Sequence, residues 1–130
     1  MIVDSSALIA IMTQESDGPA LAKIIDGFED LSISAAIYLE TSIVIDKYRD
    51  SVLSASLDDL IHDLGIKVEA VTAEQARVAR QAYRDFGRGS GHRANLNFGD
   101  CFSYALAKVK REPLLYKGDD FVHTDLRPAI

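Results

Sequence analysis

The sequence contains few residues that interrupt or cross-link a chain. Only 3 Pro and 8 Gly are scattered along its 130 residues, so no low-complexity linker divides it, and we expect a single domain over residues 1–130. The single cysteine, Cys101, excludes an intrachain disulfide, which fits a reducing compartment. The longest apolar run, Ala7 to Met12, is too short to cross a bilayer, and Asp4 interrupts the segment where a signal peptide would be apolar. These absences predict a cytoplasmic globular protein with no membrane partner.

The sequence also lacks the common motifs for nucleotide triphosphates and for zinc. Neither GxxxxGKS/T nor GxGxxG occurs, so nothing indicates a glycine loop that binds phosphates. HExxH, CxxC and clustered histidines are absent as well. No zinc site therefore competes with a site made of carboxylates.

Short apolar segments alternate with amphipathic ones along the whole chain. The expected strands are residues 1–3, 31–34, 67–71 and 114–116, and the expected helices are residues 7–13, 20–28, 35–49, 58–64, 73–86 and a last one from Asn97. Strands that alternate with helices predict an α/β fold with a mainly parallel central sheet.

Acidic residues stand directly after two of the expected strands. Asp4 follows the first strand, and Asp119 and Asp120 follow the last one. Each has an ordinary explanation, Asp4 as a helix N-cap and the other two as an acidic turn. The carboxyl ends of parallel strands are also where ligands bind in such folds, so both interpretations stay open.

Two further carboxylates lie early in expected helices. Glu40 is three residues from both Ile37 and Ile43, which places it on the apolar face of its helix or at the edge of that face. A carboxylate buried there without a partner costs several kcal/mol, whereas one at the edge reaches solvent. Asp100 is three residues after Asn97, the spacing of a capping box.

Taken together, these acidic residues indicate more than caps and turns. Three or four carboxylates that converge at one edge of a sheet repel each other, and a hard divalent cation relieves that repulsion. Mg²⁺ prefers oxygen ligands and keeps several waters, which suits a few carboxylates. Such an ion activates water and neutralises the charge that develops on a phosphodiester.

Four blocks of the sequence resemble a known family. They are "MIVDSSALIAI", "AAIYLETSIVI", "NLNFGDCFSYALAK" and "PLLYKGDDFVHTDL", and they follow in order across essentially the whole chain. They resemble the PIN-domain ribonucleases, and most closely the VapC toxins of bacterial toxin–antitoxin pairs. The resemblance implies a three-layer α/β/α sandwich, an endoribonuclease that depends on Mg²⁺ or Mn²⁺, a homodimer, and a VapB-type antitoxin that neutralises it.

The resemblance also assigns roles to individual residues. It implies that Asp4, Glu40 and Asp100 are catalytic carboxylates that bind the metal, and that Ser6 supports Asp4. The fourth catalytic acid is ambiguous, because one family pattern would place it at Gly118. The pattern GxDFxxTD selects Asp120 instead, with Asp119 as a possible supporting residue.

Basic residues are concentrated in one segment of an acidic chain. The net charge of −6 argues against a nucleic-acid partner, yet Arg77, Arg80, Arg84, Arg88 and Arg93 supply five of the 14 basic residues. The first four follow a helical stripe that faces either solvent or RNA phosphates. Arg84, Arg88 and Arg93 are the candidates for RNA binding.

Two other classes of protein compete with an RNA endonuclease. A metal-binding phosphotransfer or phosphatase domain would need a second acid beside Asp4, where Ser5 and Ser6 stand. A non-catalytic RNA-binding module with the same fold would not need a full acidic set.

Overall fold

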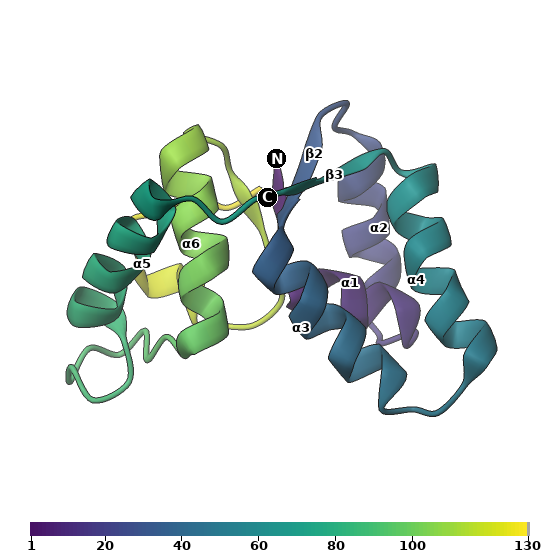
Figure 1. Ribbon diagram of the computed structural model, residues 1–130, viewed down its shortest axis with the longest axis horizontal. Coiled ribbons are helices and arrows are strands. Elements are labelled where there is room, and N and C mark those ends of the chain that lie inside the picture. Colours follow the sequence, from purple (N-terminus) through teal and green to yellow (C-terminus); the bar gives the residue numbers. More distant parts are fainter. Residues whose placement is uncertain (130) are drawn as a thin grey trace.

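The computed structural model describes residues 1–129 and places a parallel sheet between two layers of helices. The chain runs β1 (Ile2–Val3), α1 (Ser5–Met12), α2 (Gly18–Asp26), β2 (Leu31–Ser34), α3 (Ala35–Asp46), α4 (Ser51–Asp63), β3 (Ile66–Glu69), α5 (Ala73–Phe86), α6 (Phe98–Lys110), β4 (Leu114–Leu115) and a short 3₁₀ helix (Phe121–His123). Helices α1 to α4 lie on one side of the sheet, and α5 and α6 lie on the other (Figure 1). The predicted α/β/α sandwich is confirmed.

The four strands are parallel and follow the order β3-β2-β1-β4. Ile2 pairs with Ser32 of β2 and with Leu114 of β4, so β1 is a central strand. The chain proceeds from β1 to β2 in one direction, and β4 is added on the other side of β1. Ligands of parallel α/β sheets bind beyond the carboxyl ends of strands at such a reversal, which here lies between β1 and β4.

Two apolar clusters hold the helical layers to the sheet. One joins α1 to α4 to the sheet through residues such as Leu8, Ile33 and Ile37, and the other joins α5 and α6 to it through residues such as Leu106 and Leu114. All four residues of β2 are buried, as expected for a strand covered on both faces. Packing on both faces therefore fixes the position of the sheet and of the residues that follow its strands.

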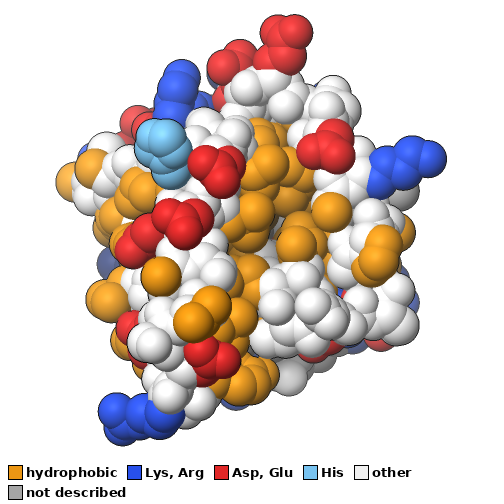
Figure 2. Space-filling view, turned by 90° about the vertical axis from the view of Figure 1, so that its right-hand side faces the viewer, with side chains coloured by type: hydrophobic (Ala, Val, Ile, Leu, Met, Phe, Trp, Pro, Cys, Tyr) orange, Lys and Arg blue, Asp and Glu red, His pale blue; other side chains and the backbone are white. Residues whose placement is uncertain are grey.

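One outer face of the molecule keeps apolar side chains near its surface. Hydrophobic side chains gather in a hollow on the face that α2 and α4 form (Figure 2). Ile24 of α2, Leu60 of α4 and Leu64 at the end of α4 are only partly buried and pack on the core beneath.

Candidate metal centre and nuclease site

Asp4 lies at the junction of β1 and α1 and is 3% exposed. It is the N-cap of α1, because its Oδ2 accepts the backbone N–H of Ser6 at 3.1 Å and the Ser6 hydroxyl at 2.7 Å. Its Oδ1 accepts the Ser103 hydroxyl of α6 at 2.5 Å. The N-cap interpretation is therefore confirmed, and it uses only one of the two carboxylate oxygens.

Asp100 lies in the first turn of α6 and closes the predicted capping box. The Asn97 N–H donates to Asp100 Oδ2 at 3.0 Å, and the Asp100 N–H donates to Asn97 Oδ1 at 2.8 Å. Burial nevertheless raises the pKa of Asp100 to about 6, and the charges of Asp4, Asp120 and Glu40 add to the rise. The cap lowers this pKa, but desolvation and the neighbouring carboxylates prevail.

Glu40 reaches the same place from α3. Burial raises the pKa of Glu40, and the charge of Asp4 raises it further. The Ser5 hydroxyl lies 3.5 Å from Glu40 Oε1, at the limit of a hydrogen bond, and favours the charged form. Glu40 is therefore partly buried beside other acids rather than solvated at the edge of its helix.

Asp119 and Asp120 are adjacent in the sequence but have different neighbours. The charge of Asp120 contributes to the raised pKa of Asp100. The pKa of Tyr116 is raised mainly by burial, and the charge of Asp119 raises it further. The Lys117 N–H donates to the Ser6 hydroxyl at 3.0 Å and so ties the segment after β4 to α1. Of the two acids, Asp120 is the one that joins the group formed by Asp4, Glu40 and Asp100.

Gly99 allows Glu40 to approach α6 closely. A Cβ atom at this position would collide with the Glu40 carboxylate. The absence of a side chain at Gly99 therefore leaves the space in which Glu40 meets the first turn of α6, next to Asp100.

The donor set suits a hard divalent cation. It consists of carboxylate oxygens, and no Lys, Arg or His within residues 1–129 forms an ion pair with Asp4, Glu40 or Asp100. In this part of the chain no three His, Cys, Asp or Glu side chains already meet in a metal-binding arrangement. Mg²⁺ fits such a site because it takes one or two carboxylates directly and keeps waters as its other ligands.

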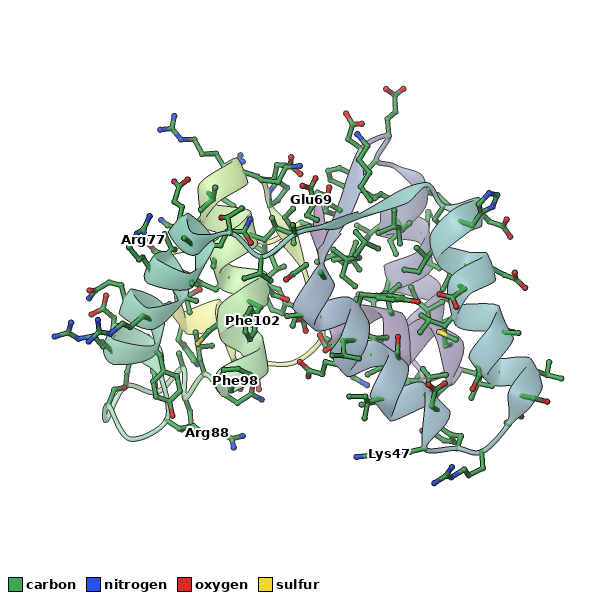
Figure 3. All side chains as sticks on the ribbon, viewed as in Figure 1. Lys47, Glu69, Arg77, Arg88, Phe98 and Phe102 are labelled. Carbon is green, nitrogen blue, oxygen red and sulfur yellow. The ribbon has the colours of Figure 1, made fainter. Side chains whose placement is uncertain are left out.

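A groove of about 670 Å³ extends from the acidic residues between α3 and α6. Its walls include Leu39, Ile43 and Phe98, which are 59%, 47% and 77% exposed. Lys47 and Arg88 also line it, and they lie on its two sides in Figure 3. The groove thus brings apolar side chains and two cations next to Glu40, which lines it as well.

The candidate RNA-binding arginines do not share one helical stripe. Arg84 lies in the last turn of α5, but this helix ends at Phe86, so Arg88 and Arg93 belong to the following loop. All three side chains are exposed. The prediction of a stripe that includes Arg88 was wrong, because Gly87 has an extended backbone that ends the helix.

Sequence reasoning missed two residues of the site. Ser103 is three residues after Asp100, on the same face of α6, and this spacing was the signal that could have identified it. Gly99 had no signal of its own, because its role depends on where α3 places Glu40.

The family assignment rests on the whole chain. The family model described as "PIN domain" matches residues 1–126. The chain therefore belongs to the PIN-domain family, as its sheet order and its group of carboxylates indicate. Within that family it is one of the VapC ribonucleases, the toxins of toxin–antitoxin systems, as the following similarities show.

The chain is similar to two ribonucleases of Mycobacterium tuberculosis. It is 56% identical to VapC28 over 130 residues, covering 100% of this chain and 98% of that protein. It is 52% identical to VapC42 over 129 residues, covering 99% of this chain and 98% of that protein.

None of the helices within residues 1–129 is long and apolar enough to span a membrane.

Two solved structures share the fold. M. tuberculosis VapC20, described as a Sarcin-Ricin loop cleaving toxin, has a TM-score of 0.73 at 18% identity and covers 98% of both chains. A toxin–antitoxin complex from Klebsiella pneumoniae has a TM-score of 0.70 at 14% identity, with 95% of this chain and 92% of that chain covered. At these identities the likeness concerns the fold alone.

Proposed function

We propose that this ribonuclease is an endoribonuclease toxin that depends on Mg²⁺, with Mn²⁺ as a substitute, and that an antitoxin neutralises it. The observation that carries the proposal is the convergence of carboxylates from separate segments: Glu40 reaches α6 at Gly99, next to Asp100, and Ser103 of α6 binds Asp4. Burial raises the pKa of Asp100 to about 6, and the charges of Asp4, Asp120 and Glu40 add to the rise. Carboxylates that repel one another near the carboxyl ends of β1 and β4 offer the oxygen ligands that a divalent cation prefers.

In this proposal Asp4 and Asp100 would hold the metal, and Glu40 and Asp120 would complete the site. When bound, the metal supplies activation of a water molecule and neutralises charge on the phosphodiester. Glu40 and Asp120 would act as hydrogen-bond acceptors that orient the attacking water. The first turn of α6 keeps Asp100 charged while the metal is present, because its backbone amides favour the carboxylate.

The RNA backbone would run over the exposed arginines beside the groove. Arg88 lines the groove, Arg84 lies in the last turn of α5, and Arg93 lies in the following loop. Phosphate contacts of this kind position a strand without reading its sequence. The choice of RNA therefore depends on contacts other than these three.

Two apolar surfaces suit the proposed protein partners. We assign the α3 side of the groove, with Leu39 and Ile43, to a second copy of the chain, because exposed apolar residues of this size are covered in stable homodimers. Arg88, on the other side of the groove, then stays open to RNA (Figure 3). The hollow between α2 and α4 is then free for an apolar helix of the antitoxin (Figure 2). The toxin–antitoxin complex from Klebsiella pneumoniae, which has the same fold, motivates the second assignment.

The function is tested by incubating the purified chain with end-labelled total small RNA in Mg²⁺ or Mn²⁺, with and without EDTA. We expect discrete fragments that need the metal and that disappear in Asp4→Asn, whose circular dichroism stays native. Asp59→Asn, an exposed acid of α4, is the matched control and should cleave like the wild type. Cleavage that survives both EDTA and Asp4→Asn would exclude the proposed site.

The same experiment separates the competing classes. RNA binding without cleavage in Mn²⁺ would favour the non-catalytic RNA-binding module. Stable binding of beryllofluoride at Asp4 would favour the phosphotransfer domain.

A further inference from the structure

Ser103 lies inside α6 but does not donate its hydroxyl to its own helix. Thr41, Ser42 and Ser56 donate to the backbone carbonyl four residues earlier, as Ser and Thr often do inside helices. Ser103 instead donates to Oδ1 of Asp4, 99 residues away along the chain, at 2.5 Å. Both residues are buried, with 1% of Ser103 and 3% of Asp4 exposed. A buried hydroxyl committed to a carboxylate is a strong, directional contact.

The acceptor positions of Asp4 are unequally filled. A carboxylate offers about four lone pairs, two on each oxygen. Oδ2 already accepts the N–H and the hydroxyl of Ser6, so it has no position left. Within residues 1–129, Oδ1 accepts a hydrogen bond from Ser103 alone and keeps one position. Oδ1 is therefore the oxygen of Asp4 that is available to a cation.

The contact also joins the two segments that carry the proposed metal ligands. Ser103 lies one turn after Asp100 on α6, so both side chains share one face of the helix. The hydrogen bond from Ser103 to Asp4 thus holds that face against the junction of β1 and α1. The Ser6 hydroxyl, fixed by the Lys117 N–H, prevents the carboxylate from turning about its own axis.

We infer that Ser103 is a positioning residue of the metal centre: it fixes the Asp4 carboxylate so that Oδ1 presents its one free lone pair, and it sets the separation of Asp4 from Asp100. This inference rests on the proposed metal-dependent function. It adds to that function a residue that contacts neither metal nor RNA. Removal of hydrogen bonds that orient ligands typically weakens metal binding about 10- to 100-fold.

The inference is tested by titrating Mn²⁺ into the metal-free full chain by calorimetry, without RNA. We expect Ser103→Ala to weaken Mn²⁺ binding about tenfold or more, with little change in the melting temperature in EDTA. Ser103→Thr keeps the hydroxyl and should restore most of the affinity. Ser42→Ala is the matched control, because it removes a helical hydroxyl that bonds only to the backbone carbonyl of Tyr38.

Each outcome decides the matter. Unchanged Mn²⁺ affinity in Ser103→Ala overturns the inference, and so does a large fall in melting temperature with no fall in affinity, which marks a structural role. If Ser103→Ala does not fold, Ser103→Cys replaces it, because a thiol is a weak donor and should weaken Mn²⁺ binding in the same way. A wild type that binds no Mn²⁺ refutes the proposed function itself. Loss of binding in Asp4→Asn but not in Ser103→Ala refutes this inference alone.

Discussion

Asp100 combines a structural role with a costly charge. Its pKa of about 6 lies above the ordinary value of 3.8, so the folded chain binds this proton more tightly than the unfolded chain. The stability that the protonated group contributes is complete below pH 3.8 and is lost as the pH rises towards 6. Near pH 7 and without metal, the ionised carboxylate therefore destabilises the fold.

Asp100→Asn should consequently stabilise the metal-free chain while it abolishes RNA cleavage. Asparagine can still accept the Asn97 N–H, so the capping box is retained. After allowance for solvent screening, we expect a gain of about 1 kcal/mol at pH 7 that vanishes near pH 4. Urea unfolding of both proteins in EDTA at several pH values measures it. Equal free energies of unfolding for the two proteins at pH 7 would show that the ionised Asp100 carboxylate does not destabilise the fold.

Gly99→Ala tests the space that Glu40 occupies. The added methyl group displaces the Glu40 carboxylate, which is the flexible partner in the collision. Alanine is the better helix former by about 1 kcal/mol, so the melting temperature should not fall. The rate of RNA cleavage should fall about tenfold or more, because a misplaced catalytic group is inefficient. Wild-type cleavage by Gly99→Ala would show that the position of Glu40 is not critical.

At the level of helices and strands, the sequence predicted the types of element better than their ends. Helix α4 begins at Ser51, ahead of the predicted Asp58, because Asp50 accepts the N–H groups of Val52 and Leu53 and caps it. This cap was readable from the sequence. The exposure of Phe98 was not readable, because it depends on how α3 and α6 lie relative to each other around the groove.

The acidic site was also predictable only in part, because sequence patterns locate residues relative to strands and helices but do not show which side chains meet. The positions after strands located Asp4 and the pair Asp119–Asp120 near one edge of the sheet, because a parallel sheet brings such positions together. The choice of Asp120 over Asp119, and the link from Ser103 to Asp4, depend on side-chain packing between distant segments. Local spacing carries no such information.

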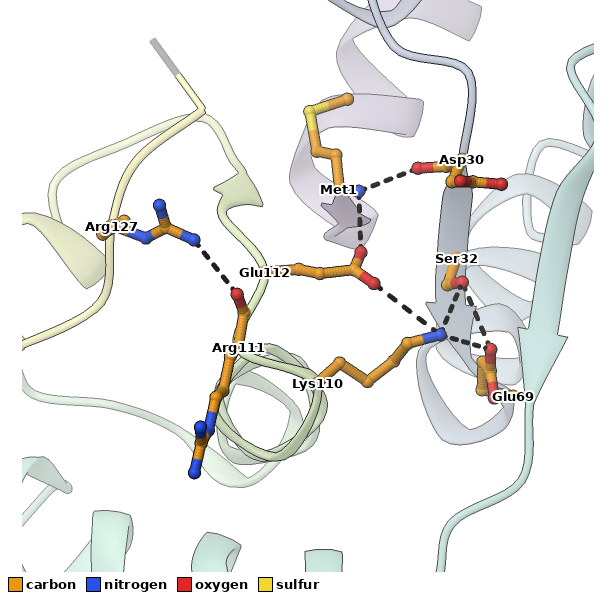
Figure 4. A network of polar contacts seen from close by, with 8 residues as sticks. All are labelled: Met1, Asp30, Ser32, Glu69, Lys110, Arg111, Glu112 and Arg127. Atoms are coloured by element: carbon orange, nitrogen blue, oxygen red, sulfur yellow. Dashed lines mark hydrogen bonds and ion pairs between the residues drawn. The ribbon is translucent and has the colours of Figure 1, made fainter.

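Lys110, in the last turn of α6, connects this helix to the sheet at the end opposite Asp100. Its ammonium lies 2.8 Å from Glu69 of β3 and 3.8 Å from Glu112, which also pairs with the amino group of Met1 at 2.7 Å (Figure 4). The hydrogen bond from Lys110 lowers the pKa of Glu69. The pair therefore stabilises the fold above the ordinary pKa of 4.5, and the contribution is lost as the pH falls through the lowered value.

Lys110→Met should destabilise the chain by less than about 1 kcal/mol near pH 7, since the pair is partly exposed. The difference from the wild type should shrink as the pH falls below 4.5. Chemical unfolding at pH 7 and at lower pH measures both effects, with the exposed Lys23→Met of α2 as the control. A difference that does not depend on pH would mean that packing of the lysine stem, and not its charge, matters.

At the scale of the whole molecule, an acidic protein must bind a polyanion. The net charge is −6, yet five exposed arginines, Arg77, Arg80, Arg84, Arg88 and Arg93, follow one another along α5 and the loop after it. Binding by such a region depends strongly on salt, because each phosphate that is neutralised releases counterions. The salt dependence of binding therefore reports which arginines touch RNA.

Arg88→Ala should weaken binding of single-stranded RNA and reduce the slope of log K against log salt by about 0.7, the value for one lost phosphate contact. Arg77→Ala is the control, because Arg77 and Arg88 lie at opposite ends of the α5 region in Figure 3 and only Arg88 lines the groove. Both are measured by fluorescence anisotropy in the Asp4→Asn background, so that no RNA is cut during titration. If the two variants change the slope equally, RNA follows the whole of α5. If only Arg77→Ala changes it, RNA approaches from the other end of the helix, and the groove beside the carboxylates is left to the second copy of the chain.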